Sequence, residues 1–272
     1  MPLFDLIACE IDSILERDGP EGILNADVRV LFESIFESNA HVAKLNSVVL
    51  NLDTPEVIAM AGSRDYLLLH SSAHSTWAFT RRRGRVKTVS LTPLLSLSLK
   101  LDHSPCFAQR YETSIADNAV FDPTAMLTNQ GACHWAAGEV LAKESMSTVH
   151  DFQFVGNDGP VYLKVNSKLT GNFEWVFDLK TLKALRHVCV SPGDSNLITM
   201  LELLGDVGSP TSIDYILPYV ANELHFVRWK AISVITRIDR IVGASLIEAA
   251  THDKHPEVRR AARHSLGRQK AA

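Results

Sequence analysis

Residues 255–262 read His255-Pro256-Glu257-Val258-Arg259-Arg260-Ala261-Ala262, and a related pattern stands 31 positions earlier in the chain. In this register Val227-Arg228 falls on Val258-Arg259, and Ala231 falls on Ala262. A sequence period of roughly 20 to 50 residues is typical of stacked helical repeats, in which each unit buries its apolar face against the next one. The repeat therefore predicts two antiparallel helix pairs within residues 211–269, with the repeated Val and Ala side chains buried between them.

Individual residues of this pattern suit a helix. Pro256 lacks a backbone N–H, which the first turn of a helix does not need. Val258, Ala262 and Leu266 recur at a spacing of four residues and form one apolar stripe. The Pro-x-Val-Arg-x-x-Ala pattern resembles the HEAT-like repeats of the phycobilisome-lyase type over residues 195–268. That resemblance implies a helical array whose concave surface docks a protein partner or a second copy of the chain.

The composition is that of an ordinary globular protein. The chain has 272 residues, of which 46% are hydrophobic and 21% are charged, which is enough for one large or two modest domains. Its net charge of −4 argues against general nucleic-acid binding, and no apolar run is long enough for a transmembrane helix. Acidic residues replace the basic start of a signal peptide, and the cysteines are scattered, so we expect a cytoplasmic protein with reduced thiols.

Changes in the sequence period divide the chain into three regions. Residues 1–40 show a helical spacing of apolar side chains, which is interrupted at Asp18-Gly19-Pro20. Residues 41–191 contain short β-type runs separated by turn residues, as in an all-β sandwich or barrel. After a turn cluster that begins at Ser191, residues 195–272 return to helix. We therefore predict an α+β multidomain protein with N-terminal helices, a β domain and a C-terminal HEAT-like array.

One segment of the β region alternates strictly. Positions 95, 97, 99 and 101 are Leu, whereas the positions between them are Ser, Ser and Lys. Because successive side chains of a strand point to opposite faces, we expect the leucines to point inward and the polar residues to face water. His103 extends the leucine row, and His150 shares a face with Phe152 and Phe154. The alternation thus predicts that His103 and His150 enter one cavity of a closed barrel.

The segment from His134-Trp135-Ala136-Ala137-Gly138-Glu139 to Val149-His150-Asp151-Phe152 resembles the cupin family, in a match that extends over residues 56–188. In that family a Gly and an acidic residue precede a strand, and a later histidine enters the barrel. The resemblance implies a cupin-like β domain in which Glu139 is the acidic residue of the turn and His150 is a metal ligand. The family's His-x-His pair is absent from this sequence.

The alternation and the cupin resemblance together predict a metal site made of His103, His134, Glu139 and His150. Imidazole and carboxylate ligands suit iron, manganese, zinc and nickel, so the expected cofactor is a divalent ion of this kind. Trp135 is a candidate for contact with a bound small molecule. For each residue an alternative stays open: a hydrogen-bonded core or rim histidine, a turn carboxylate, and an aromatic core residue.

The densest run of charge in the chain is Arg81-Arg82-Arg83-Gly84-Arg85. A hairpin tip with solvated arginines is one interpretation of this run. Contact of its guanidinium groups with a phosphate or another anionic ligand is the other.

Two functions from different classes fit the sequence. In the first, a cupin-like domain binds a small molecule, or acts as a metal-dependent, oxygenase-like enzyme, and the helical array is an interaction module. In the second, the protein is not an enzyme and serves as a scaffold or regulator through its HEAT-like array. No nucleophile elbow, phosphate loop or metalloprotease helix motif decides between them, so the sequence leaves open whether the protein is an enzyme.

Overall fold

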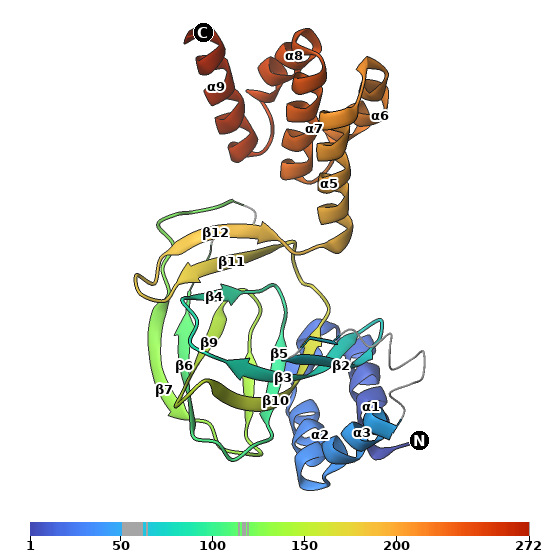
Figure 1. Cartoon of the computed structure of the whole chain (residues 1–272), viewed down its shortest axis with the longest axis vertical. Helices are drawn as coiled ribbons and strands as arrows, with labels where there is room; N and C mark the ends of the chain where they lie inside the picture. Colours follow the sequence, from blue (N-terminus) through green and yellow to red (C-terminus); the bar gives the residue numbers. More distant parts are fainter. Residues whose placement is uncertain (51–61, 64, 114, 116–117, 119, 272) are drawn as a thin grey trace. The chain divides into compact units, whose positions relative to one another are not determined.

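The computed structural model describes residues 1–50, 62–63, 65–113, 115, 118 and 120–271, so the start of the cupin-like match at residue 56 lies outside the described residues. The chain divides into two compact units, Met1–Val188 and Cys189–Ala272 (Figure 1). The boundary lies close to the turn cluster that begins at Ser191. Each unit has hydrophobic clusters of its own.

The first unit begins with helices: α1 (Leu3–Asp18), the 3-10 helix η1 (Pro20–Leu24), α2 (Ala26–Glu37) and α3 (Ala40–Leu50). α1 ends at Gly19, whose φ of 76° is a left-handed conformation that glycine adopts without a steric penalty. The prediction that the β domain begins at residue 41 is wrong over residues 41–50, which form α3. Apolar residues in this segment stand three or four positions apart, which is a helical spacing, and Ala40 and Val48 are buried.

The described strands are β1 (Gly62–Ser63), β2 (Tyr66–Ser71), β3 (Ser75–Arg83), β4 (Thr88–Leu91), β5 (Ser96–Lys100), β6 (Cys106–Glu112), β7 (Thr128–His134), β8 (Val140–Lys143), β9 (Thr148–Phe154), β10 (Asp158–Ser167), β11 (Phe173–Asp178) and β12 (Ala184–Cys189). They form three sheets with the orders β1-β2-β3-β10-β5-β8, β12-β11-β4 and β7-β6-β9. Neighbouring strands are antiparallel, as where β10 lies between β3 and β5. The α+β class is therefore confirmed.

Strand β5 is buried on both faces. Leu97 and Leu99 belong to a hydrophobic cluster that includes Phe4 of α1 and Phe32 of α2, so the leucine row packs on the side of the N-terminal helices. Ser96 and Ser98 point the other way and line a partly open cavity. The leucines are buried as predicted, but against the N-terminal helices and not towards the cavity, and the prediction that the polar residues between them face water is wrong. Alternation distinguishes two faces of a strand, but it does not say which of them a cavity will occupy.

The second unit is helical: α5 (Pro192–Val207), η2 (Pro210–Ser212), α6 (Ile213–Ile216), η3 (Leu217–Ala221), α7 (His225–Ile238), α8 (Arg240–Ala250) and α9 (Pro256–Ala271). The predicted burial of Val227, Ala231, Val258 and Ala262 is confirmed. The first pair is irregular, because Pro218 cannot donate the hydrogen bond that would continue α6, and the chain passes into η3. Kinship with the phycobilisome-lyase repeats stays a prediction. Among the helices formed by described residues, none combines the length and apolarity needed to cross a membrane.

The repeat register also holds for hydrogen bonds. Nη1 of Arg228 donates to the carbonyl oxygens of residues 222 and 223, at 2.8 and 2.9 Å. Nη1 of Arg259 donates to those of residues 253 and 254, at 2.7 and 2.9 Å. All three positions of the second set lie 31 residues after those of the first. The repeated arginine thus fixes the turn that precedes its own helix.

Candidate functional site

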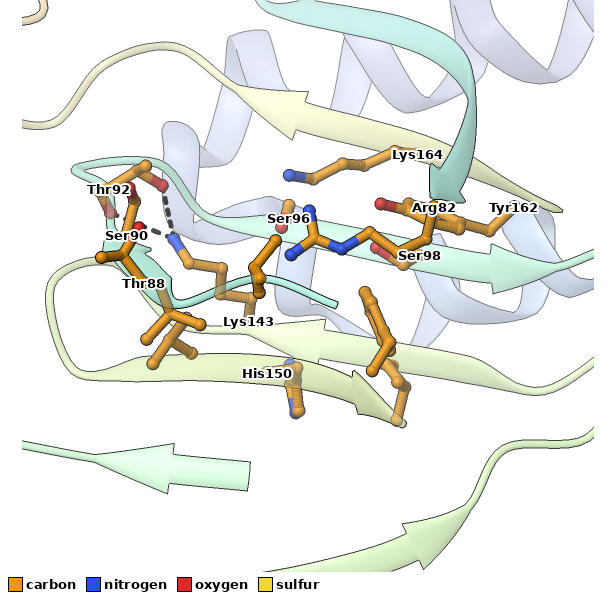
Figure 2. A pocket seen from close by; sticks show the side chains of 15 residues that line it. Arg82, Thr88, Ser90, Thr92, Ser96, Ser98, Lys143, His150, Tyr162 and Lys164 are labelled. Carbon is orange, nitrogen blue, oxygen red and sulfur yellow. Dashed lines mark hydrogen bonds between the residues drawn. The ribbon is translucent and has the colours of Figure 1, made fainter. Parts of the chain in front are cut away.

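A cavity of about 290 Å³ lies within the β region of the first unit (Figure 2). Its walls come from strands β3, β4, β5, β8, β9 and β10, so all three sheets contribute to it. The lining residues are Arg82, Val86, Thr88, Val89, Ser90, Thr92, Ser96, Ser98, Leu141, Lys143, Val149, His150, Phe152, Tyr162 and Lys164.

The cavity is cationic. Arg82, Lys143 and Lys164 enter it from three different strands, and none of the fifteen lining residues is Asp or Glu (Figure 2). Cations removed from water are costly unless anions or oxygen atoms compensate them. A cavity built in this way favours a ligand that brings negative charge.

The ammonium group of Lys143 is held by the segment before β5. Its Nζ donates to the carbonyl oxygen of Thr92 at 3.1 Å, to Oγ1 of Thr92 at 2.6 Å, and to the carbonyl oxygen of Leu94 at 3.2 Å. Burial, and then repulsion from Lys164, lower the pKa of Lys143 to about 7, and Glu174 acts weakly in the opposite sense. The charge of the cavity therefore changes close to neutral pH.

Lys164 lies in the middle of the six-stranded sheet, on β10, paired with Ser98 of β5 and Ala78 of β3. Burial lowers its pKa. No hydrogen bond or ion pair joins its ammonium group to another described residue, in contrast to Lys143. Because an ammonium group with little water around it needs acceptors, Lys164 is the group of the cavity that gains most from an anionic ligand.

His150 lines the same cavity from β9, so the inward orientation that the sequence predicted for it is confirmed. Burial, followed by the positive charges of Arg110, Lys143 and Lys164, lowers its pKa to about 4. The imidazole is therefore neutral at physiological pH. A neutral imidazole has one N–H donor and one acceptor nitrogen for a ligand.

Hydroxyl groups complete the polar lining of the cavity. They belong to Thr88, Ser90, Thr92, Ser96, Ser98 and Tyr162. Burial raises the pKa of Tyr162, with Arg82 opposing this effect, so the phenol keeps its proton. Each hydroxyl both donates and accepts, which suits a ligand that carries hydroxyl or carbonyl oxygens beside its charge.

The other predicted metal ligands lie outside this cavity. His103 is exposed because β5 ends before it, so the prediction that it points inward is wrong. His134 is exposed at the end of β7, in edge-to-face contact with Phe107. Glu139 is also exposed, and its Oε2 accepts the backbone N–H of Ala136 at 2.8 Å, which is the turn role that the sequence left open.

Trp135 is fully buried and packs as part of the core. Its Nε1 donates to the carbonyl oxygen of Glu139 at 2.9 Å, and its ring stacks on Phe152 with the centroids 4.9 Å apart. Trp135 is not among the residues that line the cavity. Contact of Trp135 with a ligand stays a prediction, and its ring neighbours Phe152 and Tyr162 lie at the cavity wall.

The alternation of β3 divides the arginine run. Arg82 lines the cavity, whereas Arg81 and Arg85 are exposed. Arg83 pairs with Asp65 and with Asp158, the latter at 2.8 Å. Of this run, Arg82 is the residue that reaches the cavity, Arg81 and Arg85 are solvated, and Arg83 is paired with carboxylates.

The cavity does not fit a divalent metal ion. Its lining offers one histidine and no Cys, Asp or Glu, and its three basic side chains disfavour a metal cation. Within the described part of the chain, three His or carboxylate ligand atoms come within 4.8 Å of one another at His225, His255 and Glu257, in the second unit. Sequence reasoning missed this group because the two histidines are far apart in the chain and only the stacking of α7 and α9 joins them. The available signal was that both stand where a repeated helix begins.

No protein-family model matches the sequence, and no curated protein matches it either. Among solved structures, a hydroquinone 1,2-dioxygenase from a Sphingomonas strain is 11% identical over 41% of this chain and 70% of its own, with a TM-score of 0.29. A protein with a double-stranded β-helix domain from Klebsiella pneumoniae is 8% identical over 46% and 90%, with a TM-score of 0.28. A cupin domain from Bordetella pertussis is 10% identical over 40% and 99%, with a TM-score of 0.26. Identities and TM-scores this low do not establish a family or a shared fold.

Proposed function

We propose that the β region is a cupin-like small-molecule-binding module and that its ligand is a small, polar anion such as a hydroxylated carboxylate or a phosphate ester. The observation that carries this proposal is the lining of the cavity: three cations, a neutral imidazole and six hydroxyl groups, with no carboxylate among them. The first unit contains the whole of this lining.

Each cation has its own part in this proposal. Arg82 presents a planar guanidinium that can hold two oxygens of a carboxylate or phosphate. Lys164 supplies an ammonium group whose burial is compensated only when the ligand arrives. The charge of the ligand also offsets the repulsion between Lys143 and Lys164, so binding raises the pKa of Lys143 above about 7.

A metal-dependent, oxygenase-like activity in the cavity needs ligands that its lining does not offer. His150 is the residue that would exchange a proton with a bound substrate, since it is neutral and lines the cavity beside the proposed anion site.

A second candidate function rests on the second unit, as an interaction module. Large apolar side chains are exposed on α5 and in the segment after it, including Met200, Leu203, Val207 and Tyr215. Such side chains are typical of surfaces that meet another protein. The mass of the protein in solution tests self-association: a monomer at all concentrations would restrict this function to a different protein.

The anion site is tested by calorimetric titration of the full-length protein with gluconate and with sorbitol, which have similar hydroxyl groups but differ in charge. We expect gluconate to bind and sorbitol not to bind. Lys164→Gln and Arg82→Gln should each weaken gluconate binding at least about tenfold, as expected for loss of a charge-assisted hydrogen bond. The exposed Lys168 gives the matched control Lys168→Gln, which should bind normally.

The pH dependence supplies a further arm of this test. Gluconate keeps its charge above pH 5, so a change in affinity at higher pH reports on the protein. Affinity should fall as the pH rises through and above 7, because Lys143 then loses its proton. Equal binding of sorbitol and gluconate, or normal gluconate binding by Lys164→Gln, would contradict the proposed anion site.

A further inference from the structure

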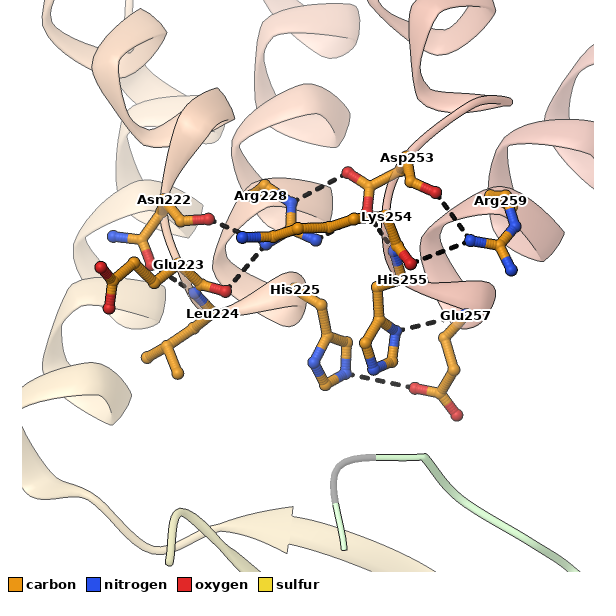
Figure 3. A network of polar contacts seen from close by, with 10 residues as sticks. All are labelled: Asn222, Glu223, Leu224, His225, Arg228, Asp253, Lys254, His255, Glu257 and Arg259. Atoms are coloured by element: carbon orange, nitrogen blue, oxygen red, sulfur yellow. Dashed lines mark hydrogen bonds and ion pairs between the residues drawn. The ribbon is translucent and has the colours of Figure 1, made fainter. Parts of the chain in front are cut away.

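The first residue of α7 and the residues around the start of α9 form a compact cluster in the second unit. His225 begins α7, His255 directly precedes α9, and Glu257 lies in the first turn of α9 (Figure 3). The imidazole rings of His225 and His255 are stacked, with centroids 3.6 Å apart and an angle of 6° between their planes. Nε2 of His225 lies 3.3 Å from Oε2 of Glu257.

One of these separations matches that between two ligand atoms of a metal site. Ligand atoms that bind one Zn²⁺ ion at roughly 2.1 Å with tetrahedral angles lie roughly 3.4 Å apart. The His225–Glu257 pair, at 3.3 Å, already has this separation. One ligand atom from each of the three residues lies within 4.8 Å of the others. Because an imidazole binds a metal in the plane of its ring, one of the two parallel rings has to turn out of the stack before both can bind the same ion.

The cluster is held by buried charges that do not themselves belong to it. Arg228 donates to both carboxylate oxygens of Asp253, at 2.9 and 2.6 Å, and both side chains are nearly buried. Asp253 in turn accepts the backbone N–H of His255 at 2.7 Å.

This linkage fixes the turn before α9 against the start of α7 (Figure 3). His255 is thereby placed over His225 through two hydrogen-bonded steps. Ligands held in place by such supporting contacts bind a metal ion more tightly than flexible ones, because less ordering is needed on binding. In the repeat register His225 aligns with Pro256 and not with His255, so the cluster belongs to the junction between two repeats and not to each repeat.

We propose that His225, His255 and Glu257 bind one divalent late first-row metal ion, such as Zn²⁺. Two imidazole nitrogens and one carboxylate oxygen are a ligand set that zinc accepts, and three protein ligands leave a position for water or another donor. The carboxylate of Glu257 supplies the one negative charge of this ligand set, which partly offsets the charge of the ion and the positive ends of the two helices.

The test uses untagged, full-length protein stripped with a chelator and titrated with Zn²⁺ by calorimetry. We expect one ion per chain and a higher unfolding temperature in the presence of Zn²⁺. Glu257→Gln, which keeps the size of the side chain, and His255→Asn should each lower the affinity at least about tenfold. The controls are His264→Asn, an exposed histidine of α9, and His150→Asn in the β cavity, and both should bind as the wild type does.

Substitution with Co²⁺ identifies the ligands. We expect visible absorption from nitrogen and oxygen ligands and no thiolate charge-transfer band, and the folded Glu257→Gln variant should need at least about tenfold more Co²⁺ to reach half of the full absorption. A thiolate band, loss of binding in His150→Asn, or unchanged binding in Glu257→Gln and His255→Asn would each overturn the proposal.

Discussion

At the scale of single residues, the cavity is lined by three basic side chains whose pKa values are lowered by burial: Lys143, His150 and Lys164. Lysine and histidine on a strand normally reach water, and nothing in the sequence around Lys143 or Lys164 marks them as inward. His150 was recognised because it shares a face with two phenylalanines. Its neighbours are nevertheless cations, and not the acidic and imidazole groups that a metal site would need. The alternation therefore predicts correctly that His150 lines the cavity, but the metal site predicted from it does not agree with the basic residues around it.

The depressed pKa of His150 makes the stability of the fold depend on pH. The unfolded chain binds a proton at this imidazole near its ordinary pKa of 6.5, whereas the folded chain binds it only near pH 4. Protons therefore favour the unfolded state between these values, and stability falls as the pH decreases from about 6.5 to about 4. The shift corresponds to at most about 3 kcal/mol.

We expect His150→Gln to lose less stability than the wild type over this pH range. Urea unfolding at pH 7, 5 and 4 measures the difference, and carboxylates that titrate in the same range cancel in the comparison. Lys143 titrates at higher pH and does not contribute to the difference between the two proteins over this range. Parallel pH profiles of the two proteins would show that His150 is hydrated in the folded state.

At the scale of elements, β5 separates an apolar face from a cavity face. Leu97 is 2% exposed and belongs to the cluster shared with α1 and α2. Leu97→Ala should therefore cost about 2 to 5 kcal/mol in unfolding free energy, since it leaves a void in a packed core. Its neighbour Ser98 lines the cavity, and Ser98→Ala should cost less than about 1 kcal/mol. Chemical denaturation of both variants checks this, and similar losses for the two would contradict the assignment of the faces.

The junction between α7 and α9 allows a comparison of two equivalent arginines. Arg228 and Arg259 make equivalent hydrogen bonds to backbone carbonyls one repeat apart, but only Arg228 also forms an ion pair with the carboxylate of Asp253. Arg228→Ala would leave a nearly buried carboxylate without its partner and should destabilise the second unit by about 3 to 5 kcal/mol. Arg259→Ala should cost clearly less. Equal losses, measured by thermal or chemical unfolding, would mean that the ion pair contributes nothing beyond the backbone contacts.

The helical elements differ in how well they can be predicted from the sequence. The helices of the second unit were predictable because the spacing of Val, Arg and Ala repeats, and repeated spacing reflects repeated packing. Helix α3 is not predicted, because the sequence interpretation begins the β region at residue 41 although the helical spacing of apolar residues continues to Leu50. The cluster of His225, His255 and Glu257 depends on which helix ends meet in space. A single sequence contains no direct record of that contact.

At the scale of the whole molecule, the two units carry separate hydrophobic clusters and separate candidate sites. The clusters around Trp77 and Trp175 draw on residues of the first unit, and those around Val227 and Val258 draw on residues of the second. The cavity residues all precede Val188, and the histidine cluster follows it. Two units with independent cores can fold and bind separately.

We therefore expect the chain to divide between Val188 and Cys189 into two folded fragments with one ligand each. Fragment 1–188 should bind gluconate with the affinity of the full chain and should not bind Zn²⁺ at the proposed site, whereas fragment 189–272 should do the reverse. Circular dichroism establishes the folding of each fragment, and calorimetry measures both ligands on both. Aggregation of fragment 1–188 with exposure of apolar surface to a hydrophobic dye would instead show that the second unit is needed to complete the first. In that case the full chain would unfold in one transition, and each ligand would raise the stability of both units together.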